Sequence, residues 1–162
     1  MTTTYVEAYD PGKITGYALG AFDEETPLGL VDTGALTYEA VKKLRYTESP
    51  VYNYCVVERF DLANNDFKAD LTGVRVEGML DMLNFPHGKI VWRSRTKKEQ
   101  VSDEILKEHG LWQTGSDVDW EDGRDANDAI IHLLGFVAFD LRHVPTLKKY
   151  FKPDYGKVVL RA

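Results

Sequence analysis

The alternation of apolar and polar positions predicts short strands in the first third of the chain. Residues 4–9 (TYVEAY), 16–22 (GYALGAF) and 28–36 (LGLVDTGAL) have strand character, and the tight turn after the first predicts a hairpin. Residues 53–60 (NYCVVERF) are rich in β-branched and aromatic side chains and predict a central strand. A short fifth strand is expected over 89–92.

Helical spacing of apolar residues dominates the rest of the chain. It predicts helices over 37–45, 70–84, 96–109 and about 125–142, with Gly110 ending the third. This element order resembles that of the ribonuclease H-like α/β fold, a mixed β-sheet of about five strands flanked by helices. No repeat or low-complexity linker divides the 162 residues, so one domain over 1–162 is expected, with a basic C-terminal tail from about 145.

The composition of the chain limits the cellular environment in which the protein is expected. The sequence has no run of eighteen apolar residues and no basic-then-apolar leader, so no membrane association and a cytoplasmic location are expected. The single cysteine, Cys55, lies in an apolar strand and is expected in the core. The net charge of −6 hides basic segments at 89–98 and 142–162 beside an acidic one at 117–128, a pattern that suits a metal-dependent phosphate enzyme or simply a solvated surface.

Four acidic residues occupy positions where a carboxylate is costly. Asp10 ends the first strand, Glu58 interrupts the most apolar one, and Asp125 and Asp128 lie at i and i+3 on the last helix. Each has another interpretation: a turn residue, an edge-strand residue, a helix cap and a partner of Arg124, respectively. Carboxylates that converge repel one another and are usually held by Mg²⁺ or Mn²⁺, which serve phosphoryl transfer.

Three segments, DPGKITGYALG, VVERF and DANDAIIHLL, together resemble the acidic motifs of the RuvC family of Holliday-junction resolvases. The resemblance implies that Asp10, Glu58, Asp125 and Asp128 are catalytic ligands of Mg²⁺ or Mn²⁺, with two ions per active site. It also implies that Lys98, in TKKEQV, is catalytic and lies near the scissile phosphate, and that helix 70–84 forms a homodimer interface. Arg59, the loop 61–69 and the tail beyond Val144 depart from the family pattern.

Basic and aromatic residues near the acids are candidate DNA contacts. The phosphate contacts would come from Arg93, Arg95, Lys97 and Lys98. Phe60 and Phe67 are candidate stacking partners for unpaired bases, with core packing as the alternative for both. His132 is expected to be a packing residue, with contact to a metal ion or a water as the alternative, and Gly16 is expected to leave room for a phosphate.

The function that these features favour is a metal-dependent endonuclease that resolves four-way DNA junctions in recombination or repair. The resemblance implies that cleavage leaves 5′-phosphate and 3′-hydroxyl ends. Two nuclease alternatives remain open, a YqgF-type RNA-processing enzyme and a general branched or flap nuclease, as does a non-catalytic junction-binding module. Actin and sugar-kinase type ATPases share the Asp-x-Gly turn but use two lobes, so no nucleotide cofactor is expected. The divergence from the family pattern suggests a phage-encoded protein that acts in a bacterial cell.

Overall fold

A five-stranded mixed β-sheet forms the centre of the molecule. The computed structural model describes residues 2–47, 52–59, 71–83, 89–114 and 124–151. The strands lie in the order β3-β2-β1-β4-β5, in which β1 pairs antiparallel with β2 and parallel with β4, and β4 pairs parallel with β5. Their bounds are β1 Thr4–Asp10, β2 Thr15–Phe22, β3 Gly29–Leu36, β4 Tyr54–Glu58 and β5 Lys89–Arg93. The predicted ribonuclease H-like fold class is confirmed.

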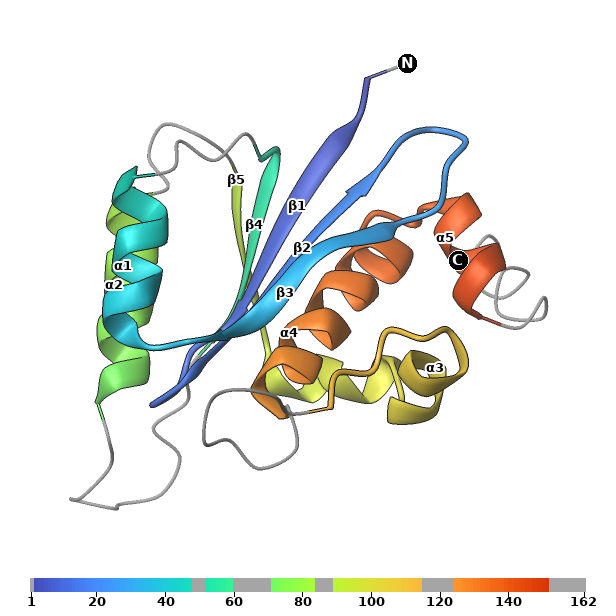
Figure 1. The fold of residues 1–162 in the computed structure, drawn as a ribbon. Coiled ribbons are helices and arrows are strands. Elements are labelled where there is room, and N and C mark those ends of the chain that lie inside the picture. The colour runs from blue at the N-terminus through green and yellow to red at the C-terminus, as the bar shows by residue number, and fades with distance from the viewer. Residues whose placement is uncertain (1, 48–51, 60–70, 84–88, 115–123, 152–162) are drawn as a thin grey trace.

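Helices cover both faces of this sheet (Figure 1). One face carries α1 (Tyr38–Thr47) and α2 (Thr72–Leu83), which lie side by side. On the other face, α4 (Arg124–Gly135) crosses β1 and β2, and it is accompanied by α3 (Asp103–Glu108) and α5 (Val144–Tyr150). None of the helices in the described ranges is long and apolar enough to cross a membrane.

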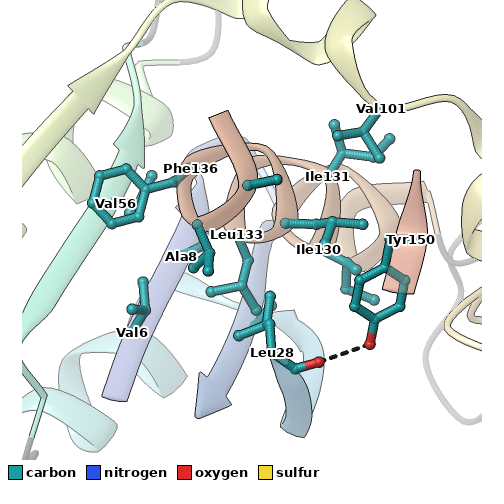
Figure 2. Close-up of a cluster of buried hydrophobic side chains, with 14 of the residues drawn as sticks. Val6, Ala8, Leu28, Val56, Val101, Ile130, Ile131, Leu133, Phe136 and Tyr150 are labelled. Atoms are coloured by element: carbon teal, nitrogen blue, oxygen red, sulfur yellow. Dashed lines mark hydrogen bonds between the residues drawn. The ribbon is translucent and has the colours of Figure 1, made fainter. Parts of the chain in front are cut away.

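Each face of the sheet has its own hydrophobic core, because side chains alternate between the two faces along a strand. On the α4 face, Val6 and Ala8 of β1 and Val56 of β4 pack against Ile130 and Leu133 (Figure 2). On the α1 and α2 face, Tyr9 and Val57 pack against α2, together with the buried Cys55 as predicted. By the same alternation, the side chains two positions after Ala8 and Val56 also point toward α4.

Helix α5 is hydrogen-bonded to the segment that connects β2 and β3. The Tyr150 hydroxyl donates to the Leu28 carbonyl at 2.7 Å (Figure 2), and the Leu28 N–H donates to Thr146 Oγ1 at 2.8 Å. Leu147 and Phe151 are buried in the α4-side core. The part of the predicted basic tail up to residue 151 is therefore integrated into the fold, whereas residues 152–162 lie outside the described ranges.

Two helix predictions need correction. The helix expected over 96–109 is divided into η1, a 3₁₀ helix over Arg95–Gln100, and α3, because Val101 is extended (φ −130°) and buried. The helix expected over 125–142 is α-helical only to Gly135 and continues as η3, a wider π-type turn over Phe136–Asp140.

Candidate active site

The parallel pairing of β1 and β4 brings Asp10 and Glu58 to the same end of the sheet. Tyr9 pairs with Val57, so the next residue of each strand, Asp10 and Glu58, emerges at the shared C-terminal edge. Alternation turns both side chains toward α4, as it does for Ala8 and Val56. Glu58 is buried and its strand lies between β1 and β5, so the interpretation of Glu58 as an edge-strand residue is wrong.

A single lysine ammonium lies at the centre of the acidic residues. Lys98 Nζ is 3.0 Å from Asp10 Oδ2, 2.7 Å from Glu58 Oε2 and 2.9 Å from Asp128 Oδ2. Lys98 comes from the 3₁₀ helix η1, and its three partners come from β1, β4 and α4. Asp128 therefore pairs with Lys98, and carboxylates that are far apart in the sequence converge on one positive charge.

Asp125 lies one turn before Asp128 in the first turn of α4 and makes none of the three Lys98 ion pairs. The helix begins at Arg124, so Asp125 is inside the first turn and is not the helix cap. Partial burial, with the nearby Asp128 charge, raises the pKa of Asp125. Asp125 thus belongs to the same electrostatic environment while remaining free of a direct contact with the ammonium.

Gly16 sets how closely α4 approaches the sheet. A Cβ atom at this position would overlap the backbone carbonyl of Asp125, so only glycine lets the start of α4 pack on β2. The expectation that Gly16 leaves room for a phosphate is wrong: the space is filled by the backbone of α4. The glycine still serves the site, because this approach positions Asp125 and Asp128 over the end of β1.

His132 has a more specific role than the packing predicted for it. Its Nε2 lies 2.6 Å from Glu58 Oε2, its ring is fully buried, and within the described ranges its Nδ1 has no hydrogen-bond partner. Burial lowers the pKa of His132 even though Glu58 opposes this shift, so the neutral ring is favoured. The contact is then an Nε2–H donating to the Glu58 carboxylate, which fixes the orientation of that carboxylate.

The acidic residues differ in their affinity for protons. Burial, with the Glu58 and Asp128 charges, raises the pKa of Asp10 well above its usual value, although Lys98 opposes the shift. Burial also acts on Glu58, but hydrogen bonds from His132 and Lys98 outweigh it and lower the Glu58 pKa to about 2. For Lys98, burial favours the neutral amine, but Asp10, Glu58 and Asp128 raise its pKa above the ordinary lysine value. The site therefore holds a charged Lys98 and an ionised Glu58.

Arg93 is a buried structural residue, which corrects its assignment as a DNA contact. Only 1% of the residue is exposed, and its guanidinium donates to the His132 carbonyl at 2.8 Å and to Gln100 Oε1 at 2.7 Å. It also forms an ion pair with Asp140 at 3.1 Å, and Gly135 leaves the space it occupies. Arg93 ties β5 to η1, α4 and η3, and so supports the elements that carry Lys98 and His132.

The remaining predicted DNA contacts fall into two groups. Lys97 is half-buried and pairs with Asp140 at 2.9 Å, whereas Arg95 is exposed. Phe60 and Phe67 lie outside the described residues. Their proposed stacking on bases stays a prediction.

A cleft of about 1230 Å³ opens beside the carboxylates. Asp10, Glu58, Asp128 and Lys98 line it, as do Arg59, Trp92 and Arg95. Arg59 and Trp92 were not singled out as site residues from the sequence. Two features of the sequence could have identified them. One is the unusual arginine directly after Glu58, and the other is an aromatic residue near the end of a strand that is followed by basic residues.

The donor set suits a hard divalent cation. Asp10, Glu58 and Asp128 offer only carboxylate oxygens, which Mg²⁺ and Mn²⁺ prefer, and all three already contact one cationic group. Within the described ranges, no three acidic, histidine or cysteine side chains are arranged as a ready metal site, since the carboxylates are drawn onto Lys98. The residues fit the ion in chemistry, with Lys98 as its competitor for the same oxygens.

Comparisons with known proteins agree with this architecture. No protein-family model and no curated protein sequence matches the chain. Among solved structures, Thermus thermophilus RuvC in complex with a Holliday junction substrate matches with a TM-score of 0.61 at 12% identity, covering 86% of this chain and 96% of that one. The yeast mitochondrial Holliday junction resolvase Ydc2 matches with a TM-score of 0.59 at 14% identity, covering 96% and 84% of the two chains. The chain thus has the fold of the RuvC-like Holliday junction resolvases.

Proposed function

We propose that the protein is a metal-dependent endonuclease that cleaves branched DNA, with the four-way junction as its preferred substrate. The observation that carries the proposal is the convergence of Asp10, Glu58 and Asp128, from three separate elements, on one cation. Carboxylates gathered in this way are costly to the fold unless they serve a positively charged group. The likeness in fold to proteins described as Holliday junction resolvases supports branched DNA as the substrate.

In this proposal, Asp10, Glu58, Asp125 and Asp128 hold two Mg²⁺ or Mn²⁺ ions. When bound, these ions supply Lewis acidity for the scissile phosphodiester and for the attacking water. His132 keeps the Glu58 carboxylate in a fixed orientation through its 2.6 Å contact. Asp125, which is free of Lys98, is the carboxylate best placed to accept a cation without displacing the lysine.

In this proposal Lys98 has one role in the metal-free protein and another in the metal-bound protein. In the metal-free protein its ammonium neutralises three carboxylates that would otherwise repel one another. Lys98 also lines the cleft, so with cations held by these carboxylates its ammonium would be available to donate a hydrogen bond to a non-bridging oxygen of the scissile phosphate. In-line hydrolysis then leaves a 5′-phosphate and a 3′-hydroxyl.

A homodimer would place two such sites on one junction, as two coordinated cuts require. The interpretation of helix 70–84 as a packing helix also has support, since Val76, Met79 and Leu80 of α2 are buried against the sheet. The helix nevertheless exposes Val74 and Met82 at 39% and 77%, and Leu71 just before it at 56%. We propose that these exposed apolar residues form the dimer contact.

A panel of labelled substrates tests the proposed function. Four-way, three-way, flap and linear duplex DNA and the corresponding RNA are incubated with the protein in Mg²⁺ and in Mn²⁺. Preferential cutting of the four-way junction, and none in the presence of a chelator, is the expected result. Equal cutting of linear duplex would identify a general nuclease, cutting of RNA alone would identify an RNA-processing enzyme, and binding without cutting would identify a junction-binding module.

A further inference from the structure

The residues that line the cleft include two chemically different sets. Asp10, Glu58 and Asp128 are acidic, and Arg59, Trp92 and Arg95 form a second set, which we call the basic-aromatic wall. At about 1230 Å³, the cleft exceeds the roughly 300–1,000 Å³ of small-molecule pockets, so it has room for more than the reacting phosphate.

The positive charges around this cleft are not equivalent. Arg93, Lys97 and Lys98 are committed to acidic side chains of the protein, at 3.1, 2.9 and 2.7–3.0 Å. The exposed side chains of Arg59 and Arg95, in contrast, form no ion pair with any described residue. Among the described residues that line the cleft, these two guanidinium groups are therefore cations that remain available to an external phosphate.

The backbone fixes Arg59 next to the catalytic acids. Its N–H donates to the Arg93 carbonyl at 2.8 Å, which continues the β4–β5 pairing one residue beyond Glu58. Arg95 follows the end of β5 at the start of η1, the helix that also carries Lys98. Arg59 thus lies directly after β4, and Arg95 is the first residue of η1.

Trp92 lines the same cleft as a partly buried aromatic residue. It pairs with Val57 in the β4–β5 register and packs against the core on the α1 and α2 face, while another part of it lines the cleft. Since Glu58 points to the opposite face of the sheet, the cleft continues around the C-terminal end of the sheet, from the carboxylates to Trp92. A ring anchored on one side and open on the other can stack with a base at little entropic cost.

We propose that the basic-aromatic wall is a nucleotide subsite: it binds an unstacked nucleotide next to the scissile phosphate, with its base on Trp92 and its flanking phosphates at Arg59 and Arg95. The inference deepens the proposed function and rests on it for the identity of the substrate. An intact duplex must unstack a base to fill this subsite, whereas a branch point offers unpaired or weakly stacked bases. The subsite therefore contributes to selection of branched over linear DNA.

The experiment measures junction binding by fluorescence anisotropy without divalent cations, so that no cutting occurs. W92L removes the aromatic ring but keeps an apolar side chain, and it is expected to weaken junction binding by about 5- to 150-fold, the range for losing one stacked base. W92F keeps a ring and should lose less. R59Q is expected to lower the slope of log affinity against log salt by about one, whereas K42Q, which removes an exposed charge on α1 outside the cleft, should leave junction affinity unchanged.

A substrate change tests the same subsite without altering the protein. An abasic nucleotide next to the cut position should weaken binding by wild-type protein and should have no further effect on W92L. Equal affinity of wild type and W92L for the intact junction, or an abasic penalty of the same size in both, would overturn the subsite. If wild type cuts junctions while these tests fail, the subsite alone is wrong; if wild type cuts no nucleic acid, the proposed function is wrong whatever the anisotropy shows.

Discussion

Replacing Lys98 by methionine removes the one positive charge shared by Asp10, Glu58 and Asp128. The side chains involved retain exposed fractions of 20% for Lys98, 14% for Asp10, 8% for Glu58 and 25% for Asp128, so water screens the site only partly. Removing one partner from a buried ion pair costs about 3–5 kcal/mol, and the residual exposure favours the lower end of this range. At about 2–4 °C per kcal/mol for a chain of this size, a loss of about 3 kcal/mol lowers the Tm by about 6–12 °C.

Lys97 supplies a matched control in the same 3₁₀ helix. Its side chain is 44% exposed and pairs with Asp140 alone, so K97M should cost at most about 1 kcal/mol. Thermal unfolding is followed by circular dichroism at pH 8 in a chelating buffer, where the carboxylates are most readily ionised, and is then repeated with Mn²⁺. Mn²⁺ should raise the Tm of K98M more than the Tm of wild type, because the carboxylates of K98M no longer have the lysine ammonium as a counter-ion.

The affinity for metal ions gives a second, independent measurement of the competition between Lys98 and a metal ion for the carboxylate oxygens. Calorimetric titration with Mn²⁺ should show tighter binding to K98M than to wild type, by about tenfold or more, which corresponds to about 1.4 kcal/mol. Unchanged Tm in the chelating buffer together with unchanged Mn²⁺ affinity would refute the assignment of Lys98 as the internal counter-ion of the site.

Three further predictions concern the supporting structure. G16A should lower the Tm and disrupt the site because its methyl group overlaps the Asp125 carbonyl, whereas G34A, which has no atom within 4 Å of the added carbon, should change the Tm little in the same calorimetric scan. Burial raises the pKa of Glu7 from 4.5 to about 7 despite its 2.6 Å ion pair with Arg45, so the folded state binds the extra proton between these pH values. The free energy of unfolding should therefore fall as pH rises from 4.5 through 7 relative to E7Q, and urea titrations that show no such difference would contradict this. M82E, which places a charge on exposed α2, should convert a dimer to a monomer in sedimentation velocity, and a dimer that persists unchanged would exclude this face.

Much of the fold could be predicted from local patterns. Strand alternation, short apolar runs and helical spacing identified the five strands and the helices α1, α2 and α4, because the burial of these elements follows from residues close together in the sequence. The interruption after η1 could not be predicted, since it depends on Val101 entering the core in an extended conformation. Nor could the π-type turn η3, which presents Asp140 to Arg93.

Site residues could be predicted where a charged residue occupies a position at which the strand pattern predicts an apolar one. Glu58 in an apolar strand and Asp10 at a strand end are such residues, and the structure brings both to Lys98. Arg93 was misassigned because a basic residue at a strand end has the same local pattern whether it faces solvent or the interior. Its partners come from Gln100, His132 and Asp140, and Gly135 provides its space, so only the tertiary structure distinguishes the two cases. His132 was likewise recognisable as a packing residue but not as the hydrogen-bond partner of Glu58.

The most direct test of the proposed function is junction cleavage by E58Q. Glutamine keeps the shape of the side chain but removes the charge at the centre of the contacts with Lys98 and His132. With a labelled four-way junction in Mg²⁺, the wild-type protein should cut symmetrically paired strands, and E58Q should bind the junction without cutting it. Cleavage by E58Q at the wild-type rate would show that these carboxylates do not perform the reaction.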